Sequence, residues 1–328
     1  MAIDAAIIGA GSMGTALAQF ISQNVREVFL FARRTEVVES INRERANKDY
    51  FPALRLRKNI RAFSMGELGN INEVQALILA VPSSSIREVA DTLKEYPRDR
   101  IIISVAKGIE YPSLKTMSQV IAEETGNENV IAFSGATFAD EIAYGRVAGV
   151  TLGIRNETPK PLLTRMFDGF GLDYSRDIET VELCGVLKNV YAIALGMWDS
   201  VMGGHNGHYA FLTLCFKEMN DILRVISSDE EIATKFCCFG DLNLTCNVDK
   251  SRNRTLGLML GKKLVLPGGV RASVVLEGVK SAKAIKEVAS RHAVHAPIAG
   301  FVSEVLEGRT EIDEEIYRVF KVATMKGR

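Results

Sequence analysis

A lysine lies in the middle of an apolar segment, where an unpaired charge is costly. Residues 181–198 read VELCGVLKNVYAIALGMW, and Lys188 and Asn189 interrupt a run that is apolar nearly all round, which predicts a buried helix. Burying an ammonium without a partner costs several kcal/mol or lowers its pKa. A lysine tuned in this way can give a proton to a developing alkoxide, so Lys188 is the candidate general acid. The alternative is a lysine at the helix edge whose ammonium reaches water.

A helix start further along the chain has the side chains of an anion site. Residues 247–254 read NVDKSRNR, and Ser251 is predicted to cap a helix over 251–260 whose first residues are Arg252 and Asn253. A hydroxyl, a guanidinium and an amide at a helix start suit a phosphate. Asp241 lies ten residues before Ser251 and would hold or tune Lys188 by its charge if the intervening loop folds back. A capped surface helix is the alternative.

A glycine-rich turn begins the chain. A predicted strand over 5–8 runs into GAGSMG, which places Gly9, Gly11 and Gly14 in the G-x-G-x-x-G spacing, with a helix predicted over 13–23. The first glycine makes a tight turn, the second lets the backbone approach a pyrophosphate, and the third lets helix and strand pack closely. The position between a strand and a helix therefore predicts a dinucleotide site.

Two arginines follow the second predicted strand, over 28–32. An NAD-preferring site usually has an acid at this position for the ribose hydroxyls, whereas this chain has Arg33 and Arg34. Arginine pairs well with a 2′-phosphate, so the sequence favours NADP(H) and leaves NAD(H) possible. A solvated basic turn is the alternative. A second lysine, Lys107, directly follows the strand segment that begins at 101, where ligands of doubly wound sheets bind, although a surface loop lysine is equally compatible with the pattern.

The elements that must position these residues change character along the chain. Strands are predicted over 5–8, 28–32, 76–80, 101–104, 130–133 and 150–154, alternating with helices over 13–23, 35–45, 82–96 and 114–124. This alternation predicts βαβ units and a mainly parallel, doubly wound Rossmann-like sheet. Beyond about residue 177 the apolar spacing is helical, over 181–198, 210–226, 251–260, 274–291 and 314–322. We expect an α/β dinucleotide-binding domain over 1–178 and an all-α substrate domain over 179–328.

Composition excludes several classes of function. The 40 basic and 40 acidic residues balance, which argues against nucleic acid or an anionic membrane as the main partner. Five cysteines without a CxxC pair favour a reducing compartment, and we expect a cytoplasmic protein without a signal peptide or integral membrane segment. Two histidine pairs at a spacing of three, His205 with His208 and His292 with His295, lack an obvious third ligand, so we expect no metal.

The motifs together resemble the bacterial-type NAD(P)-dependent glycerol-3-phosphate dehydrogenases over nearly the whole chain. The matching segments are GAGSMGTALA at the start, Asn47 with YFP at 50–52, AVPS at 80–83, KGIE at 107–110, SGATFADEI at 134–142, ELCGVLKNVYAIALG at 182–196, GDLNLTC at 240–246, SRNR at 251–254 and LEG at 276–278. Each match alone is weak, but their joint order and spacing are specific. The resemblance implies reversible hydride transfer between NAD(P)H and glycerone phosphate, supply of glycerophospholipid precursors and a homodimer.

The resemblance also implies a role for each matching residue. Lys188 falls on the catalytic lysine, and Lys107 on a lysine near both cofactor and substrate. The implied substrate positions are Lys107, Gly135, Thr137, Lys188, Asp241, Ser251, Arg252 and Asn253. The implied cofactor positions are Gly9, Gly11, Ser12, Met13, Gly14, Arg33, Tyr50, Lys107, Ala139, Arg252 and Glu277.

The chain departs from the family pattern at a few positions. Ala136 stands where a proline is usual, Thr137 replaces a serine but keeps the hydroxyl, and His205-Asn206 stands where an Asp-Asn pair is usual. Two other functions remain open at this point. A β-hydroxyacid dehydrogenase or ketopantoate-reductase-like enzyme would act on a carboxylate substrate, and a dinucleotide-binding sensor would bind cofactor without turnover.

Overall fold

The computed structural model describes residues 3–264 and 273–325 of the 328-residue chain. The chain divides into two compact units. Unit 1 comprises Met1–Lys107 and Thr116–Glu182, and unit 2 comprises Gly108–Lys115 and Leu183–Arg328. The predicted boundary at 178/179 falls at the beginning of helix α7 (Ile178–Val201), whereas the division between the units falls after Glu182. The short segment 108–115, which sequence placed in the first domain, groups with unit 2.

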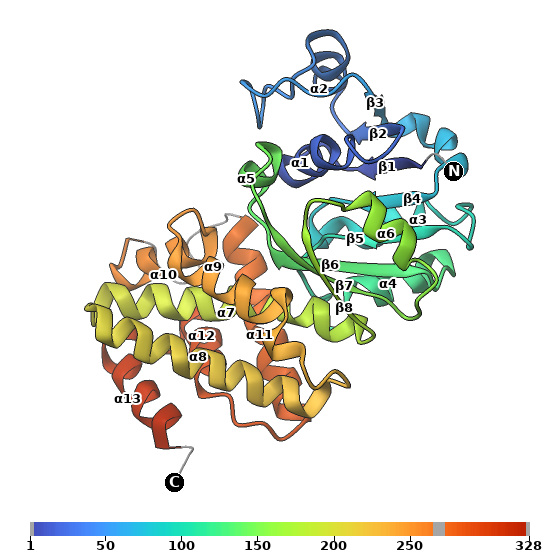
Figure 1. The fold of residues 1–328 in the computed structure, drawn as a ribbon. Helices are drawn as coiled ribbons and strands as arrows, with labels where there is room; N and C mark the ends of the chain where they lie inside the picture. Colours follow the sequence, from blue (N-terminus) through green and yellow to red (C-terminus); the bar gives the residue numbers. More distant parts are fainter. Residues whose placement is uncertain (1–2, 265–272, 326–328) are drawn as a thin grey trace. The chain divides into compact units, whose positions relative to one another are not determined.

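Unit 1 is built on an eight-stranded sheet in the order β3-β2-β1-β4-β5-β6-β7-β8 (Figure 1). The strands are β1 (Asp4–Ile8), β2 (Glu27–Ala32), β3 (Ile60–Ser64), β4 (Ala76–Leu79), β5 (Ile101–Ser104), β6 (Val130–Ala136), β7 (Gly149–Gly153) and β8 (Gly171–Ser175). Neighbouring strands are parallel except for β6 and β7, which are antiparallel. The order reverses between β1 and β4, which is the switch point where doubly wound sheets bind ligands.

Helices cover both faces of this sheet, because successive side chains of β1 point to opposite faces and are buried on both. Ala5 and Ile7 pack into a core with α1 (Ser12–Ile21), α5 (Ala139–Ala143) and α6 (Lys160–Met166). Ala6 and Ile8 point to the opposite face and pack into a second core with α3 (Ile86–Asp91) and α4 (Met117–Thr125). Successive strand residues point to opposite faces, so a strand buried on both sides reads as a continuous apolar run. The predicted doubly wound sheet is confirmed.

Several local predictions were wrong. The strand β3 was missed, as was the 3-10 segment η2 (Met65–Glu73), whereas η3 (Ser83–Ser85) lies within the predicted helix 82–96. The predicted helix 35–45 consists of α2 (Thr35–Glu39) continued by a π-helical turn, η1 (Ser40–Glu44), which ends at Arg45 with a left-handed backbone (φ 58°). The predicted helix 82–96 is regular over α3 alone. These differences occur in short elements, where the periodic apolar signal is weakest.

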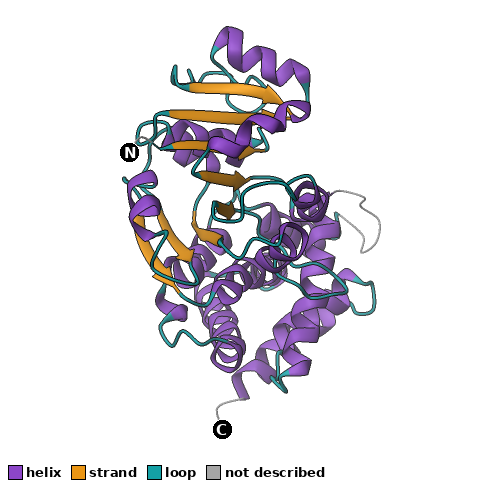
Figure 2. Cartoon of the chain, turned by 90° about the vertical axis from the view of Figure 1, so that its right-hand side faces the viewer, coloured by secondary structure: helices purple, strands orange, loops and turns teal. Residues whose placement is uncertain are grey.

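The regular elements of unit 2 are all helices in its described residues after Leu183, and Figure 2 shows the contrast with the strands of unit 1. Its elements are most of α7 (Ile178–Val201), α8 (His205–Ile226), η4 (Ile232–Thr234), η5 (Phe236–Gly240), α9 (Asp241–Asn247), α10 (Arg252–Gly261), α11 (Ser273–Arg291), α12 (Pro297–Leu306) and α13 (Ile312–Met325). The helix α9 corrects the prediction of a loop that folds back through Asp241, and α12 was missed.

Helix α7 is the central element of unit 2. Trp198 of α7 stacks on Phe211 of α8, with ring centroids 4.7 Å apart. Helix α10 approaches the backbone of α7 closely, because a Cβ added at Gly257 would lie 2.1 Å from the carbonyl oxygen of Ile193. Glycine at the crossing therefore permits a distance that a larger residue would prevent. These contacts bring the α10 start and the second half of α7 together.

Helix α7 also has the length and hydropathy of a membrane-spanning helix. Its 24 residues contain an 18-residue window of mean hydropathy 1.3, but 94% of that window is buried inside the protein. A core helix surrounded by protein is apolar all round for the same reason as a membrane helix. The apolar character of α7 is therefore accounted for by its burial.

Candidate active site

The glycine turn of unit 1 lies at the switch point of the sheet. Gly9 has φ +110°, and a Cβ there would lie 2.5 Å from the carbonyl oxygen of Ala80, which follows β4. A Cβ at Gly14, in the first turn of α1, would lie 1.8 Å from the carbonyl oxygen of Gly9. By contrast, a Cβ at Gly11 would meet nothing within 4 Å. The first and third glycines are thus required by packing, and the second faces open space, as a close approach by a pyrophosphate demands.

A buried asparagine supports this turn. The Asn47 amide donates to the carbonyl oxygen of Ala10 at 2.9 Å and to the hydroxyl of Thr15 at 2.8 Å. Asn47 is 1% exposed, so these bonds form away from water. Tyr50, a predicted cofactor residue, is exposed three residues later. The loop after η1 therefore reaches the glycine turn through Asn47.

The predicted cofactor residues beside this turn are accessible. Ser12 and Met13 are half-buried in the first turn of α1, and Ala139 is half-buried at the start of α5. Arg33 follows β2 and is exposed, while Arg34 forms an ion pair with Asp49. Unit 1 therefore has an exposed guanidinium, that of Arg33, directly after its second strand, as the sequence predicts.

Three predicted substrate residues converge on one carbonyl group in unit 1. The Lys107 ammonium donates to the carbonyl oxygen of Gly135 at 3.0 Å, and the Thr137 hydroxyl donates to the same oxygen at 3.1 Å. Lys107 comes from the end of β5, whereas Gly135 and Thr137 come from the end of the adjacent strand β6. Neighbouring parallel strands thus bring these residues together at the carboxyl edge of the sheet.

Lys188 is buried in α7 and has two partners on α9. Its ammonium forms an ion pair with Asp241 and donates to the Thr245 hydroxyl at 2.9 Å. The Thr245 hydroxyl in turn donates to the carbonyl oxygen of Asp241 at 2.7 Å. The side chains of Lys188 and Asp241 are 9% and 1% exposed, so this is a buried pair, and removing either charge would be strongly destabilising. The predicted contact between Lys188 and Asp241 is present.

Sequence reasoning missed Thr245. Asp241 and Thr245 are four residues apart in α9, so both side chains lie on one face of the helix. That spacing was a usable signal, but the segment was interpreted as a loop. The adjacent Cys246 is not a nucleophile candidate, because burial raises the pKa of its thiol to about 12, although Lys188 and Arg254 lower it. All five cysteines are buried, and none of them forms a disulfide.

The helix α10 begins as predicted at the anion-binding motif. The Ser251 hydroxyl accepts a bond from the backbone amide of Arg254 at 3.3 Å, which makes Ser251 the N-cap. Arg252 is exposed and Asn253 is half-buried in the first turn. The guanidinium of Arg254 forms an ion pair with Asp199, near the end of α7. Unit 2 therefore holds both its buried lysine and a capped, basic helix start.

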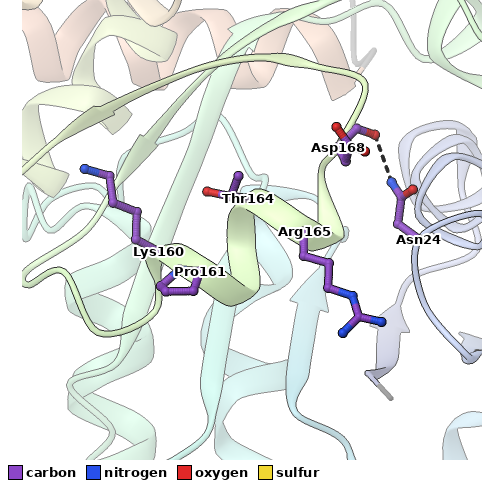
Figure 3. Close-up of a pocket in the computed structure, with 6 residues that line it drawn as sticks. All are labelled: Asn24, Lys160, Pro161, Thr164, Arg165 and Asp168. Carbon is purple, nitrogen blue, oxygen red and sulfur yellow. Dashed lines mark hydrogen bonds between the residues drawn. The ribbon is translucent and has the colours of Figure 1, made fainter. Parts of the chain in front are cut away.

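Three further observations concern the predicted cofactor residue Glu277, metal binding and the surface of unit 1. The side chain of Glu277 lies outside the described residues, so its predicted cofactor role stays a prediction. Among the described residues, no group of three or more His, Cys, Asp and Glu side chains could hold a metal ion. A hollow of about 620 Å³ on unit 1 is lined by Asn24 and five residues from Lys160 to Asp168 (Figure 3). It contains none of the predicted site residues.

The fold and these groups define a class of protein. A Rossmann-like sheet with a glycine turn at its switch point, joined to a helical unit with a buried lysine–carboxylate pair, is the architecture of a two-domain nicotinamide-dependent dehydrogenase.

Comparison with known proteins gives the family. Residues 4–159 match the N-terminal domain, and residues 177–317 the C-terminal domain, of NAD-dependent glycerol-3-phosphate dehydrogenase. The chain belongs to this family and is thus an NAD(P)-dependent oxidoreductase acting on a CH–OH group.

Individual relatives agree with this assignment. A glycerol-3-phosphate dehydrogenase [NAD(P)+] of Methanothermobacter thermautotrophicus is 45% identical over 283 residues, which cover 86% of this chain and 87% of the relative. One from Erythrobacter litoralis is 34% identical, covering 94% and 93%. The crystal structure of the Coxiella burnetii glycerol-3-phosphate dehydrogenase superposes with a TM-score of 0.85 at 27% identity, covering 98% of this chain and 99% of that one.

Proposed function

We propose that the protein catalyses the reversible reduction of glycerone phosphate to sn-glycerol 3-phosphate. The observation that carries this proposal is the buried Lys188, held by Asp241 and Thr245 in the unit that also contains the α10 start. The named activity of the relatives, at up to 45% identity, supports the substrate. Either a phosphate or a carboxylate could bind at the capped helix start at Ser251, so the family match is what disfavours a β-hydroxyacid dehydrogenase.

The glycine turn fits a dinucleotide. Its open position at Gly11 and the N-terminus of α1 suit a pyrophosphate, which would lie against Gly9, Gly11, Ser12, Met13 and Gly14. Tyr50, Ala139 and Glu277 are the further proposed cofactor contacts. When bound, a nicotinamide cofactor donates or accepts the hydride. The exposed Arg33 supports a preference for NADP(H), because a guanidinium pairs with a 2′-phosphate.

Lys188 acts as the general acid or base in this proposal. In reduction its ammonium gives a proton to the C2 oxygen of the substrate, and in oxidation its amine takes that proton back. Asp241 balances the buried charge, and the Thr245 hydroxyl fixes the direction of the ammonium. The orientation of the Lys188 ammonium therefore depends on both α9 side chains.

The remaining residues position the substrate. Ser251, Arg252 and Asn253 would bind its phosphate at the α10 start, and Arg252 is also a proposed cofactor contact. Lys107, Gly135 and Thr137, which meet at one carbonyl group, contact the three-carbon body. Positioning of this kind can contribute roughly 7–11 kcal/mol to lowering the barrier. A phosphate anchor thus serves catalysis although it lies away from the reacting carbon.

The Lys188→Met variant tests the proposed chemistry. We expect kcat for NADPH oxidation with glycerone phosphate to fall by about 10²- to 10⁴-fold, because the proton donor is lost. Lys217→Met, an exposed lysine on α8, is the matched control and should retain wild-type kcat. Near-wild-type turnover by Lys188→Met would exclude the proposed role. Turnover of small keto acids alone would favour a ketopantoate-reductase-like enzyme, and NADPH binding without turnover of either would favour a sensor.

The Arg33→Ser variant tests the cofactor preference. We expect KM for NADPH to rise by about tenfold and KM for NADH to stay within about twofold, because only NADPH has the 2′-phosphate. Arg43→Ser, on η1, is the control at another exposed arginine. An equal rise of both KM values would show that Arg33 does not read the phosphate.

We also propose a cytoplasmic homodimer that supplies glycerophospholipid precursors. Several large apolar side chains of unit 2 are exposed, among them Tyr209, Val225 and Phe239, which supports an interface on this unit. Light scattering after size-exclusion chromatography tests the assembly, and a mass near 36.0 kDa would contradict it.

A further inference from the structure

His208 of α8 has an oxygen atom in front of each ring nitrogen. Its Nδ1 lies 2.8 and 3.0 Å from the two carboxylate oxygens of Asp199, and its Nε2 lies 2.8 Å from Oδ1 of Asn247. The side chains of His208 and Asp199 are 13% and 14% exposed, so their contact is largely shielded from water, whereas Asn247 is exposed. Asp199 belongs to α7 and Asn247 is the last residue of α9, so the ring bridges three helices.

The carboxylate of Asp199 and Oδ1 of Asn247 can only accept hydrogen bonds. An ionised carboxylate has no proton to donate. The amide of Asn247 is oriented by its own donor group, because Nδ2 donates to the carbonyl oxygen of Asn243 at 2.8 Å. Rotating that amide would place two oxygens against each other, so Oδ1 must face the ring.

A neutral imidazole cannot satisfy this arrangement, because it has one N–H and one lone pair. With the proton on Nδ1, the lone pair of Nε2 would face the lone pairs of Asn247. With the proton on Nε2, the lone pair of Nδ1 would face the Asp199 carboxylate. The doubly protonated ring donates in both directions and gains a charge-assisted bond to Asp199.

We propose that His208 is held as an imidazolium and acts as a positioning residue for the phosphate-binding start of α10. The charge reaches that helix through Asp199, which also accepts from the guanidinium of Arg254. Arg254 in turn donates its backbone amide to the Ser251 cap. The second half of this proposal rests on the proposed function of that helix start.

The cluster of His208, Asp199 and Arg254 carries a net positive charge in this proposal, and the other groups near it do not cancel that charge. Asp199 is shared by two cations, His208 and Arg254, while Asp249 lies 3.6 Å from Nε of Arg254 but is 92% exposed and screened by solvent. The ring of Tyr209 contacts His208 edge-on at 4.8 Å and brings no charge. A net positive charge behind the α10 start favours a phosphate there.

The protonation state can be observed without any activity. Two-bond ¹H–¹⁵N correlation spectra of the full-length protein report whether each histidine nitrogen carries a proton, and the His208→Gln variant assigns the signals. We expect both nitrogens of His208 to give the protonated pattern at about pH 7. A signal from a bare ring nitrogen at that pH would overturn the imidazolium.

Kinetics test the positioning role. At about pH 6.5 we expect His208→Gln to raise KM for glycerone phosphate about tenfold, with kcat and KM for NADPH within about twofold. His208→Lys should restore the low KM because it keeps the cation. His205→Gln, an exposed histidine on the same helix, is the matched control.

The outcomes separate this proposal from the function on which it rests. If wild-type protein does not reduce glycerone phosphate, the proposed function fails, and the spectra still decide the charge of His208. If wild type is active but His208→Gln leaves KM unchanged, the positioning role fails alone. Failure of His208→Lys to restore the low KM would show that the charge is not what matters.

Discussion

A buried carboxyl group at the beginning of α7 gives unit 1 a pH-dependent stability. Glu182 is 5% exposed and accepts a bond from the backbone amide of Ser118 at 2.9 Å and another from its hydroxyl. Burial raises the pKa of Glu182 from 4.5 to about 7, although the bonds from Ser118 and Thr116 lower it. The folded protein therefore holds a proton that the unfolded chain releases between these two values.

The sign and size of the effect follow from proton linkage. Between about pH 4.5 and 7 the folded state binds more protons than the unfolded state, so the free energy of unfolding falls as pH rises. The contribution of Glu182 is fully present below pH 4.5 and is lost as pH rises through about 7. A shift of 2.5 units, the difference between 7 and 4.5, corresponds to about 3 kcal/mol at 1.36 kcal/mol per unit.

Glu182→Gln isolates this term, because glutamine has the same shape and does not titrate. Urea unfolding followed by circular dichroism should show the wild type losing about 3 kcal/mol relative to the variant between pH 5 and 8. Ser118→Ala removes a bond that lowers the pKa of Glu182, so it should move the loss to higher pH. A wild-type-minus-variant difference that stays constant within about 1 kcal/mol across this range would refute the reasoning.

Three further substitutions test individual contacts. Thr245→Val removes an acceptor of the buried Lys188 ammonium, and we expect a loss of about 2 kcal/mol in urea unfolding together with a lower kcat; an unchanged kcat would contradict its role. Gly257→Ala places a Cβ 2.1 Å from the carbonyl oxygen of Ile193 and should cost about 1–3 kcal/mol by forcing α7 and α10 apart, whereas an unchanged urea midpoint would show that the crossing relaxes. Glu218→Gln puts an amide donor against one of the two backbone amides that begin α12, so we expect a loss of about 1–3 kcal/mol, and wild-type stability would show that the carboxylate is not needed there.

The parts of the fold that were predictable are those whose signal is local. The strand–glycine–helix start was predicted within two residues at each end, because the spacing of Gly9, Gly11 and Gly14 encodes a backbone requirement. Helix α7 was predicted from its length and its apolar character. The α10 start was predicted because an N-cap serine is a feature of the chain itself.

The elements that were missed depend on tertiary contacts. The five-residue strand β3 lies at the sheet edge, paired with β2 alone, and its buried Ile60 and Ala62 alternate with the exposed Arg61 over too short a run to be distinctive. The seven-residue helix α9 has no side-chain cap, and its polar residues suggest a loop. Such a segment is helical because it packs against other helices, which a local pattern does not reveal.

The difference between local signals and tertiary contacts also explains which site residues were predicted and which were missed. The Lys188–Asp241 pair was predicted because a buried ammonium requires a counter-charge, and an acid in a neighbouring motif was the natural partner. Thr245 could have been found from its spacing to Asp241 only by placing α9 correctly. The contacts of His208 join residues 9 and 39 positions apart, and no periodic pattern links them.

Burial of charge links the catalytic and binding parts of unit 2. Lys188 requires Asp241, and Arg254 requires Asp199, since each cation would be costly to bury alone. Lys188 and Asp199 both belong to α7, so a single rigid helix holds the proposed proton donor and the anchor of the phosphate-binding helix start. A displacement of α7 would therefore move both groups together, and their spacing would be preserved.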